Sequence, residues 1–152
     1  MKISIDQIKK LRKETQSAVA DCRNALEKAH GNFNKAKEIL KSLGLDKAAK
    51  KKDRAVLAGL VDTYIHAGGR IGSIIEVNCE TDFVARTDEF KTLTHELAMQ
   101  ISAMNPENVN DLLKQEYIRD VSKNVNDLIK ETIAKVGENI KVARFVRFEL
   151  GN

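Results

Sequence analysis

The chain has 152 residues, long enough for one domain, or one domain with a small appendage, to bury a core without disulfides. It has one proline, eight glycines and no apolar run of about 18 residues, which excludes collagenous, low-complexity and membrane-spanning classes. The two cysteines, Cys22 and Cys79, form neither a disulfide framework nor a CxxC pair, so we expect buried, reduced thiols in a cytosolic protein.

The net charge of +4 is unevenly distributed along the chain. Residues 1–54 carry 15 Lys and Arg against 7 Asp and Glu, whereas residues 55–152 carry 11 against 15. Such asymmetry suggests two units that meet different surroundings. The basic part would suit a nucleic acid or an acidic protein equally well.

The first 44 residues are predicted to form three short helices. Ser4 and Gln7 fit a capping box, and the first helix should end near residues 15–17. The second helix should end at Gly31, and the third should begin after Asn32 and end at Gly44. The expected inward positions of the second and third helices are Val19, Cys22, Leu26, Ala29, Ala36, Ile39, Leu40 and Leu43. Short helices are stable only when packed together, which predicts a three-helix bundle over residues 1–45.

Residues 46–54, DKAAKKKDR, contain five cations and no large apolar residue. We interpret them as a basic linker or solvated helix at a domain boundary. The functional alternative, a cationic docking strip, remains open at this point.

Residues 55–152 show the period-two pattern of strands. Leu60–His66 and Ile71–Cys79 are predicted to form a hairpin, with Ile71, Ser73, Ile75, Val77 and Cys79 on one face of its second strand, and Ile140–Leu150 is predicted to form a third strand. In this third strand, one face should carry Ile140, Val142, Val146, Phe148 and Leu150. Helical stripes at residues 90–104, 109–113 and 121–136 provide a cover. The predicted fold is α+β, with a small three-stranded antiparallel sheet covered by helices.

The sequence offers little for catalysis. The strongest candidate is the acidic cluster Glu80, Asp82, Asp88 and Glu89 with His66, because paired carboxylates can act as acid and base. However, Asp88 and Glu89 also suit the first turn of a helix, where negative charge is favourable. His95-Glu96 lacks the second histidine of a zinc-binding helix. We therefore expect no enzyme, metal or cofactor.

Nucleic-acid binding is the competing class. Lys9, Lys10, Arg12, Lys13 and Arg23, with Lys50–Lys52, could contact phosphates. The basic part has a single aromatic residue, Phe33, and so lacks the side chains on which bases stack. A solvated charged helix face is the simpler interpretation.

Residues 78–87 lie between a predicted strand and a predicted helix. Phe83 and Val84 fit neither apolar stripe well. Phe83 lies seven residues before Phe90, which would suit an extra buried turn. Alternatively, the segment is a loop tip that presents an aromatic side chain beside an acid, as partner-binding loops often do.

Four blocks of the sequence together resemble one family, bacterial elongation factor Ts. They are LRKETQSAVADCRNALEKAHGNFNKAKEILKSLG, KAAKKKDR, the segment IGSIIEVNCETDFVART with FKTLTHELAMQI, and IAKVGENIKVARFVRFELG. They cover most of the chain. The resemblance implies that the amino-terminal helices form a ubiquitin-associated-like bundle.

The resemblance also implies a function, guanine-nucleotide exchange on the translational GTPase elongation factor Tu. Thr81–Val84 would form the exchange loop, with Asp82 and Phe83 inserted near the GTPase's magnesium site. The bundle would dock on the GTPase through Arg12, Val19, Ala20 and Arg23. No covalent chemistry, direct nucleic-acid binding or membrane contact would be required.

The chain departs from the family in two respects. The docking motif's Gly-Ala-Gly-Met-Met turn is Gln16-Ser17-Ala18-Val19-Ala20 here, so the turn must form without glycine. In addition, longer relatives carry two related core halves and a helical insertion. Short members form homodimers, and we expect pairing through the edge strand Ile140–Leu150. A monomer is the alternative.

Overall fold

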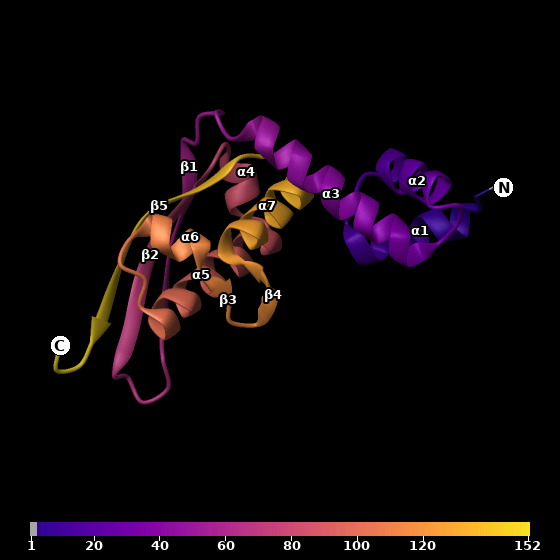
Figure 1. Cartoon of the computed structure of the whole chain (residues 1–152). Coiled ribbons are helices and arrows are strands. Elements are labelled where there is room, and N and C mark those ends of the chain that lie inside the picture. The colour runs from indigo at the N-terminus through magenta and orange to yellow at the C-terminus, as the bar shows by residue number, and fades with distance from the viewer. Residues whose placement is uncertain (1–2) are drawn as a thin grey trace.

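The computed structural model describes residues 3–152 and shows an elongated α+β molecule (Figure 1). At one end lies a helical unit built from α1 (Ile5–Thr15), α2 (Val19–Lys28) and the first half of α3 (Phe33–Lys51). The predicted capping box is confirmed: the Ser4 hydroxyl accepts a bond from the Gln7 N–H, and the Gln7 side chain accepts one from the Ser4 N–H. The small apolar core of this unit is formed mainly by Leu11, Cys22, Ala25, Leu26, Ala36 and Leu40.

Helix α3 differs from the prediction because it does not end at Gly44. It continues to Lys51 through most of the segment expected as a linker, and Ala48 packs in the core of the second unit. The reason is a close helix crossing. A Cβ on Gly44 would lie 2.8 Å from the Cβ of Ala134, so this glycine lets α3 lie against α7 (Val125–Val136). The helix connects the two ends of the molecule in Figure 1.

The second unit contains the predicted three-stranded antiparallel sheet. Its strands are β1 (Ala58–Ile65), β2 (Ile71–Cys79) and β5 (Ile140–Glu149), in the order β1-β2-β5. Helix α5 (Asp88–Met104) packs against β1 and β2, and α7 packs against α5. The central strand β2 directs Ser73, Ile75, Val77 and Cys79 into the core, as predicted.

Strand β5 contains a bulge that the period-two pattern did not predict. Arg144 pairs with Glu76 whereas Val142 pairs with Val77, so Ala143 is the extra residue. The bulge changes which side chains share a face. Opposite residues in a sheet point to the same side, so the pairing places Val142 with the buried Val77. The predicted single apolar face of this strand is therefore wrong: Ile140 and Val142 point to the core, whereas Val146 and Phe148 point away.

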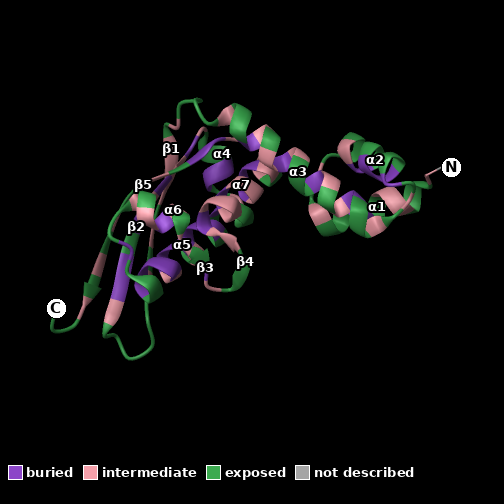
Figure 2. Ribbon diagram, in the orientation of Figure 1, coloured by how far each residue is buried: buried purple, intermediate pink, exposed green. Residues whose placement is uncertain are grey.

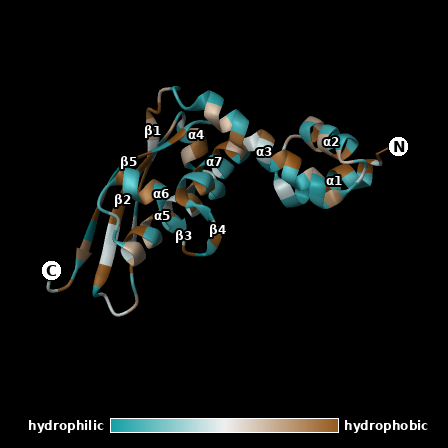
Figure 3. Ribbon diagram, in the orientation of Figure 1, coloured by the Kyte–Doolittle hydropathy of each residue, from teal (hydrophilic) through white to brown (hydrophobic). Residues whose placement is uncertain are grey.

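The other face of the sheet has no helical cover among the residues described. It exposes large apolar side chains from all three strands, namely Val61, Ile65, Ile74, Val146 and Phe148. Figures 2 and 3 show the end of β5 near the C terminus as both exposed and rich in hydrophobic residues. Most apolar faces of sheets are buried against another layer, whereas this face is an exposed apolar surface.

The expected helix over residues 121–136 begins later than predicted. A short hairpin of β3 (Glu116–Tyr117) and β4 (Asp120–Asn124) precedes it, and Val121 lies in β4 with 71% of its surface exposed. Asn124 ends the strand and caps α7, accepting a bond from the Asp127 N–H. Helix α6 (Val109–Lys114) connects α5 to this hairpin.

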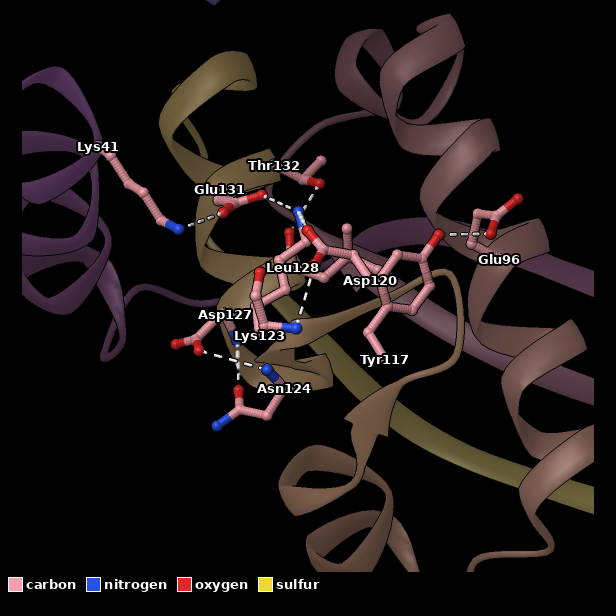
Figure 4. A network of polar contacts seen from close by, with 11 residues as sticks. Lys41, Glu96, Tyr117, Asp120, Lys123, Asn124, Asp127, Leu128, Glu131 and Thr132 are labelled. Carbon is pink, nitrogen blue, oxygen red and sulfur yellow. Dashed lines mark hydrogen bonds and ion pairs between the residues drawn. The ribbon is translucent and has the colours of Figure 1, made fainter. Parts of the chain in front are cut away.

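Charged contacts join the hairpin, α7 and α3, as Figure 4 shows. The Glu131 carboxylate accepts a hydrogen bond from Lys123 Nζ at 2.6 Å and lies 3.6 Å from Lys41 Nζ of α3. This carboxylate therefore links α7 both to the β3–β4 hairpin and to α3. No helix within residues 3–152 is long and apolar enough to cross a membrane.

Candidate functional site: the loop after the central strand

The segment between β2 and α5 forms a single helical turn, α4 (Asp82–Ala85). Thr81 caps it: its backbone is extended, and its hydroxyl accepts a hydrogen bond from the Val84 N–H at 3.4 Å. Thr87 then caps α5 through the Phe90 N–H and donates to the Val84 carbonyl at 2.7 Å. Two threonine caps therefore hold this turn on the rigid strand–helix scaffold.

The turn divides its two apolar residues between the core and the solvent. Val84 is 3% exposed and packs in the main core, whereas Phe83 is 80% exposed. The buried-turn interpretation of Phe83 is therefore wrong, and the aromatic side chain is presented at the surface. An exposed aromatic on a rigidly held turn is typical of a partner-binding residue.

Asp82 and Thr81 complete the predicted exchange loop. Asp82 is exposed, and its carboxylate makes no hydrogen bond or ion pair with the rest of the described chain. Thr81 is held by the Glu138 carboxylate: its N–H donates to Oε2 at 3.0 Å and its hydroxyl to Oε1 at 2.6 Å. The Asp82 carboxylate, which has no hydrogen-bond partner within the described chain, therefore lies next to the exposed ring of Phe83 in sequence. The residue that precedes both, Thr81, is held by two hydrogen bonds to Glu138.

Cys79 ends β2 directly below the loop. Its thiol is buried and lies 3.2 Å from the Thr81 carbonyl, to which it donates. Burial raises the pKa of this thiol, and the nearby Glu138 carboxylate adds to the effect. Cys22 in the helical unit is likewise buried with a raised pKa, mainly through desolvation. Both cysteines are therefore buried free thiols, as predicted.

The four predicted docking residues lie at the end of α1 and the start of α2. Arg12, Val19, Ala20 and Arg23 are all exposed, and Arg23 forms a 3.0 Å ion pair with Glu27. Val19 is 50% exposed, so its predicted place on the buried face of α2 is wrong, whereas Cys22, Leu26 and Ala29 are buried. All four predicted docking residues are therefore accessible to solvent.

The turn before Val19 adopts a glycine-like conformation without glycine. Gln16 has φ 55° and ψ 15°, and its N–H donates to the Arg12 carbonyl at 2.8 Å. For a residue with a Cβ this left-handed geometry costs about 1–2 kcal/mol. The left-handed conformation of Gln16 therefore lowers the stability of the folded chain.

The cluster considered for catalysis does not bring His66 and Glu80 together. His66 follows the end of β1 that pairs with Gly72, whereas Glu80 follows the end of β2 that pairs with Ala58. An eight-residue strand separates the two ends, roughly 25 Å. Glu80 already accepts a bond from the Asn139 N–H at 2.7 Å. Within residues 3–152 no group of three or more His, Cys, Asp or Glu residues is placed to hold a metal ion.

The basic helices also offer little to a nucleic-acid base. Phe33, the only aromatic residue of the basic part, has Lys10 Nζ at 5.2 Å and Lys37 Nζ at 5.7 Å from its ring centre. Both ammonium groups therefore make cation–π contacts with the Phe33 ring. Lys37 is also paired with Glu14. Stacking of bases on this ring would require both lysines to move.

Two residues of the site were missed from the sequence, Glu138 and Asn139. They lie 57 and 59 positions from their partners Thr81 and Glu80, and no local pattern relates them. Only the pairing of Ile140 with Cys79 brings them beside the loop. Their one signal in the sequence is the helix-ending Gly137, which places both in a turn at the start of a strand.

With this geometry established, comparisons with known proteins identify the family. A family model described as Elongation factor TS matches residues 80–152, the part that contains the loop and β5. Elongation factor Ts from Thermoanaerobacter sp. (strain X514) is 44% identical, over 98% of this chain and 95% of the relative. The corresponding proteins of Coprothermobacter proteolyticus and Thermotoga maritima are 43% and 42% identical, over 99% of this chain and 100% and 98% of the relatives.

The alignments also show that this chain is shorter than those relatives. The region matched in the Thermoanaerobacter protein spans 194 positions, whereas the chain has 152 residues in total. The relatives therefore carry additional residues inside the matched region, and the identity extends on both sides of them. A match of this strength over nearly the whole of both sequences shows that the chain belongs to the elongation factor Ts family.

Proposed function

We propose that this protein is a guanine-nucleotide exchange factor for elongation factor Tu in translation elongation. Members of the elongation factor Ts family in general act as nucleotide exchange factors for this GTPase. The observation that carries the proposal is Phe83, an exposed phenyl ring on a turn that is capped at both ends and anchored by buried Val84. A wedge must be both exposed and rigid, and this residue has both properties.

The proposed division of labour follows the chain. Residues 1–45 dock on the GTPase, residues 46–54 connect, and residues 55–152 present the exchange loop and form the dimer. Docking involves Arg12, Val19, Ala20 and Arg23, whose exposure supports this role. The excess of cations in residues 1–54 favours an acidic protein surface as their partner.

Exchange itself needs no covalent step. Magnesium bridges phosphate oxygens of the bound nucleotide and neutralises their charge, and backbone N–H groups of the phosphate loop hold the same oxygens. Insertion of Asp82 and Phe83 beside that ion displaces it and disturbs the loop, which weakens GDP binding. Linkage requires that nucleotide weakens factor binding by the same ratio, so rebinding of GTP releases the factor.

We further propose that the working form is a homodimer in which the exposed sheet faces pack together. Ile65, Ile74, Val146 and Phe148 lie on three adjacent strands and form an apolar patch, and Val61 lies beyond it, opposite Glu76 of the Glu76–Arg144 ion pair. This surface supports face-to-face packing rather than the pairing of β5 edges that the sequence suggested. A second copy brings an identical apolar face, which is what an isologous interface requires.

The test of exchange uses elongation factor Tu loaded with fluorescent GDP, with release followed after the protein is added with excess nucleotide. Acceleration of release by the wild type is expected, and Arg12→Ala with Arg23→Ala should raise the factor concentration needed for half the maximal rate. Absence of acceleration would contradict the proposal. Salt-sensitive RNA binding that persists without residues 55–152 would favour the nucleic-acid alternative.

The test of the dimer is sedimentation equilibrium of the full chain. Phe148→Lys should give monomers, because the substitution places a charge within an apolar interface. Val121→Lys is the matched control, since Val121 is similarly exposed but lies on the β3–β4 hairpin away from the sheet face. A monomeric wild type, or equal dissociation of both variants, would exclude this interface.

A further inference from the structure

The turn between α7 and β5 lies directly beside the exchange loop. Gly137 ends α7 with φ 80°, and Ile140 begins β5 opposite Cys79. The two intervening residues, Glu138 and Asn139, are thereby placed next to Glu80 and Thr81, at the base of α4. Neither residue belongs to the exchange loop or to the proposed docking surface.

Glu138 uses both oxygens of its carboxylate on a single residue of the loop. Oε2 accepts the Thr81 N–H at 3.0 Å, and Oε1 accepts the Thr81 hydroxyl at 2.6 Å. Bonds to a charged acceptor are about twice as strong as neutral ones. The bidentate contact fixes both the backbone and the side chain of the residue that caps α4. The rotamer of Thr81, and with it the start of the helical turn, is therefore set from outside the loop.

Asn139 fixes Glu138 in turn. It is 2% exposed, and its side-chain amide donates to the carbonyls of Lys52 and Arg54 at 3.2 and 2.8 Å. Its backbone N–H donates to Glu80 Oε1, and the Arg54 guanidinium lies 3.6 Å from the same oxygen. The turn is thus bonded both to the segment that follows α3 and to the residue that precedes Thr81.

These contacts fix Thr81, where the loop begins, but not the side chains of Asp82 and Phe83. Thr81 and Val84 are held, whereas Phe83 and Asp82 make no polar contact that would orient them. The direction of Phe83 therefore depends on the orientation of α4, and α4 depends on its cap. Buried Val84 and the Thr87 bond hold the end of α4, whereas its start depends on the Thr81 cap, so a rotation of this cap would move the phenyl ring.

We infer that Glu138 is a positioning residue for nucleotide exchange, which acts through Thr81 to hold Phe83 in its inserting geometry. The inference rests on the proposed exchange function. Without the carboxylate, α4 samples orientations in which Phe83 points elsewhere, and only the correctly oriented fraction promotes release. The helical unit still docks, so the loss falls on the maximal rate of GDP release rather than on the factor concentration for half-maximal rate.

The experiment measures that maximal rate and the half-maximal concentration for the wild type, Glu138→Ala and Glu138→Gln. Glu138→Ala should lower the maximal rate about tenfold with little change in the half-maximal concentration. Glu138→Gln keeps an acceptor oxygen for the Thr81 N–H and should remain within about threefold of the wild type. Glu107→Ala is the matched control, because this exposed glutamate has no side-chain bond within the described chain. It should leave both quantities unchanged.

Repeating the measurement in the Phe83→Ala variant separates a positioning role of Glu138 from a general loss of structure. In Phe83→Ala there is no phenyl ring to orient, so adding Glu138→Ala should have almost no further effect on the maximal rate. The same fold-loss in both backgrounds would overturn the inference and assign Glu138 a purely structural role. Amide hydrogen exchange should show faster exchange at Thr81 in Glu138→Ala, and unchanged protection there would also overturn it.

The outcomes distinguish this inference from the proposed function. If Phe83→Ala exchanges nucleotide as well as the wild type, the wedge itself is wrong. If Phe83→Ala is impaired while folded Glu138→Ala is not, the wedge stands and the positioning role fails.

Discussion

The contact between Gly44 and Ala134 gives the sharpest prediction about stability. Gly44→Ala adds a Cβ that would lie 2.8 Å from the Cβ of Ala134, closer than two carbon atoms can approach without movement of a helix. Overpacking of this kind costs about 1–3 kcal/mol. Replacing glycine by alanine within a helix contributes about 1 kcal/mol in the opposite direction. We therefore expect Gly44→Ala to lower the free energy of unfolding by about 1 kcal/mol net.

A double variant in which the glycine and the alanine are exchanged separates the steric effect of the contact from the effect of helix propensity. Ala134→Gly alone should cost about 1 kcal/mol, because it places glycine inside α7. Gly44→Ala together with Ala134→Gly restores one methyl group between the helices, and the two propensity effects cancel. The double variant should therefore lie within about 0.5 kcal/mol of the wild type, a coupling of about 2 kcal/mol.

Urea unfolding of all four proteins, followed by circular dichroism, measures this coupling. Additive effects in the double variant would refute the reasoning, because they would show that the two methyl groups do not compete for one space. A slope of unfolding that differs among the proteins would indicate that the two ends of the molecule unfold separately, and the helical signal would then resolve two transitions.

Three further predictions concern individual residues. Gln16→Gly relieves a left-handed residue and should raise the free energy of unfolding by about 0.5–1 kcal/mol, measured by urea titration. Gly59→Ala should cost more than about 3 kcal/mol, because φ is 152° and its Cβ would lie 2.2 Å from the Val77 carbonyl oxygen; a soluble, wild-type-like melt would disprove this. Cys22 and Cys79 should resist a thiol reagent at pH 8 until urea unfolds the chain, since burial raises both pKa values; prompt labelling of the native protein would contradict it.

The pH dependence of Cys79 has a defined sign. Its thiol pKa is raised in the folded protein, so the unfolded chain ionises first as the pH increases. The contribution of this thiol to stability is therefore complete below the unfolded pKa, about 8.5, and is lost as the pH rises through the folded pKa. Cys79→Ala should make the free energy of unfolding less dependent on pH above about 8.5, provided that the smaller side chain is tolerated.

Local sequence patterns predicted the elements whose causes are local. The α1 capping box, the core face of β2 and the stripe of α5 each depend on residues within a few positions of one another. The first two are confirmed, and the stripe is confirmed from Phe90 to Ile101 but not at Met104, which is exposed. The predicted end of α3 was wrong because a glycine often ends a helix. Here Gly44 instead lets α3 pack closely against Ala134 of α7, some 90 positions later in the sequence. No pattern within α3 contains that information.

The site shows the same division. The sequence marked residues 78–87 as unusual but left Phe83 either buried or exposed, because its spacing from Phe90 fits a helix face. The structure exposes it because Thr81 begins a new turn and Thr87 begins another helix. The bulge at Ala143 and the bonds of Glu138 depend on strand pairing, which links residues more than 50 positions apart. Such features follow from topology and cannot be derived from local periodicity.

The central claim is that Phe83 drives nucleotide release, and one measurement tests it most directly. The rate of fluorescent GDP release from elongation factor Tu is measured at saturating concentrations of the wild type and of Phe83→Ala, after equal unfolding curves have been established. The substitution removes an exposed side chain and should leave stability unchanged. We predict a maximal rate at least about tenfold lower for Phe83→Ala, with similar half-maximal concentrations. Equal maximal rates would contradict the account.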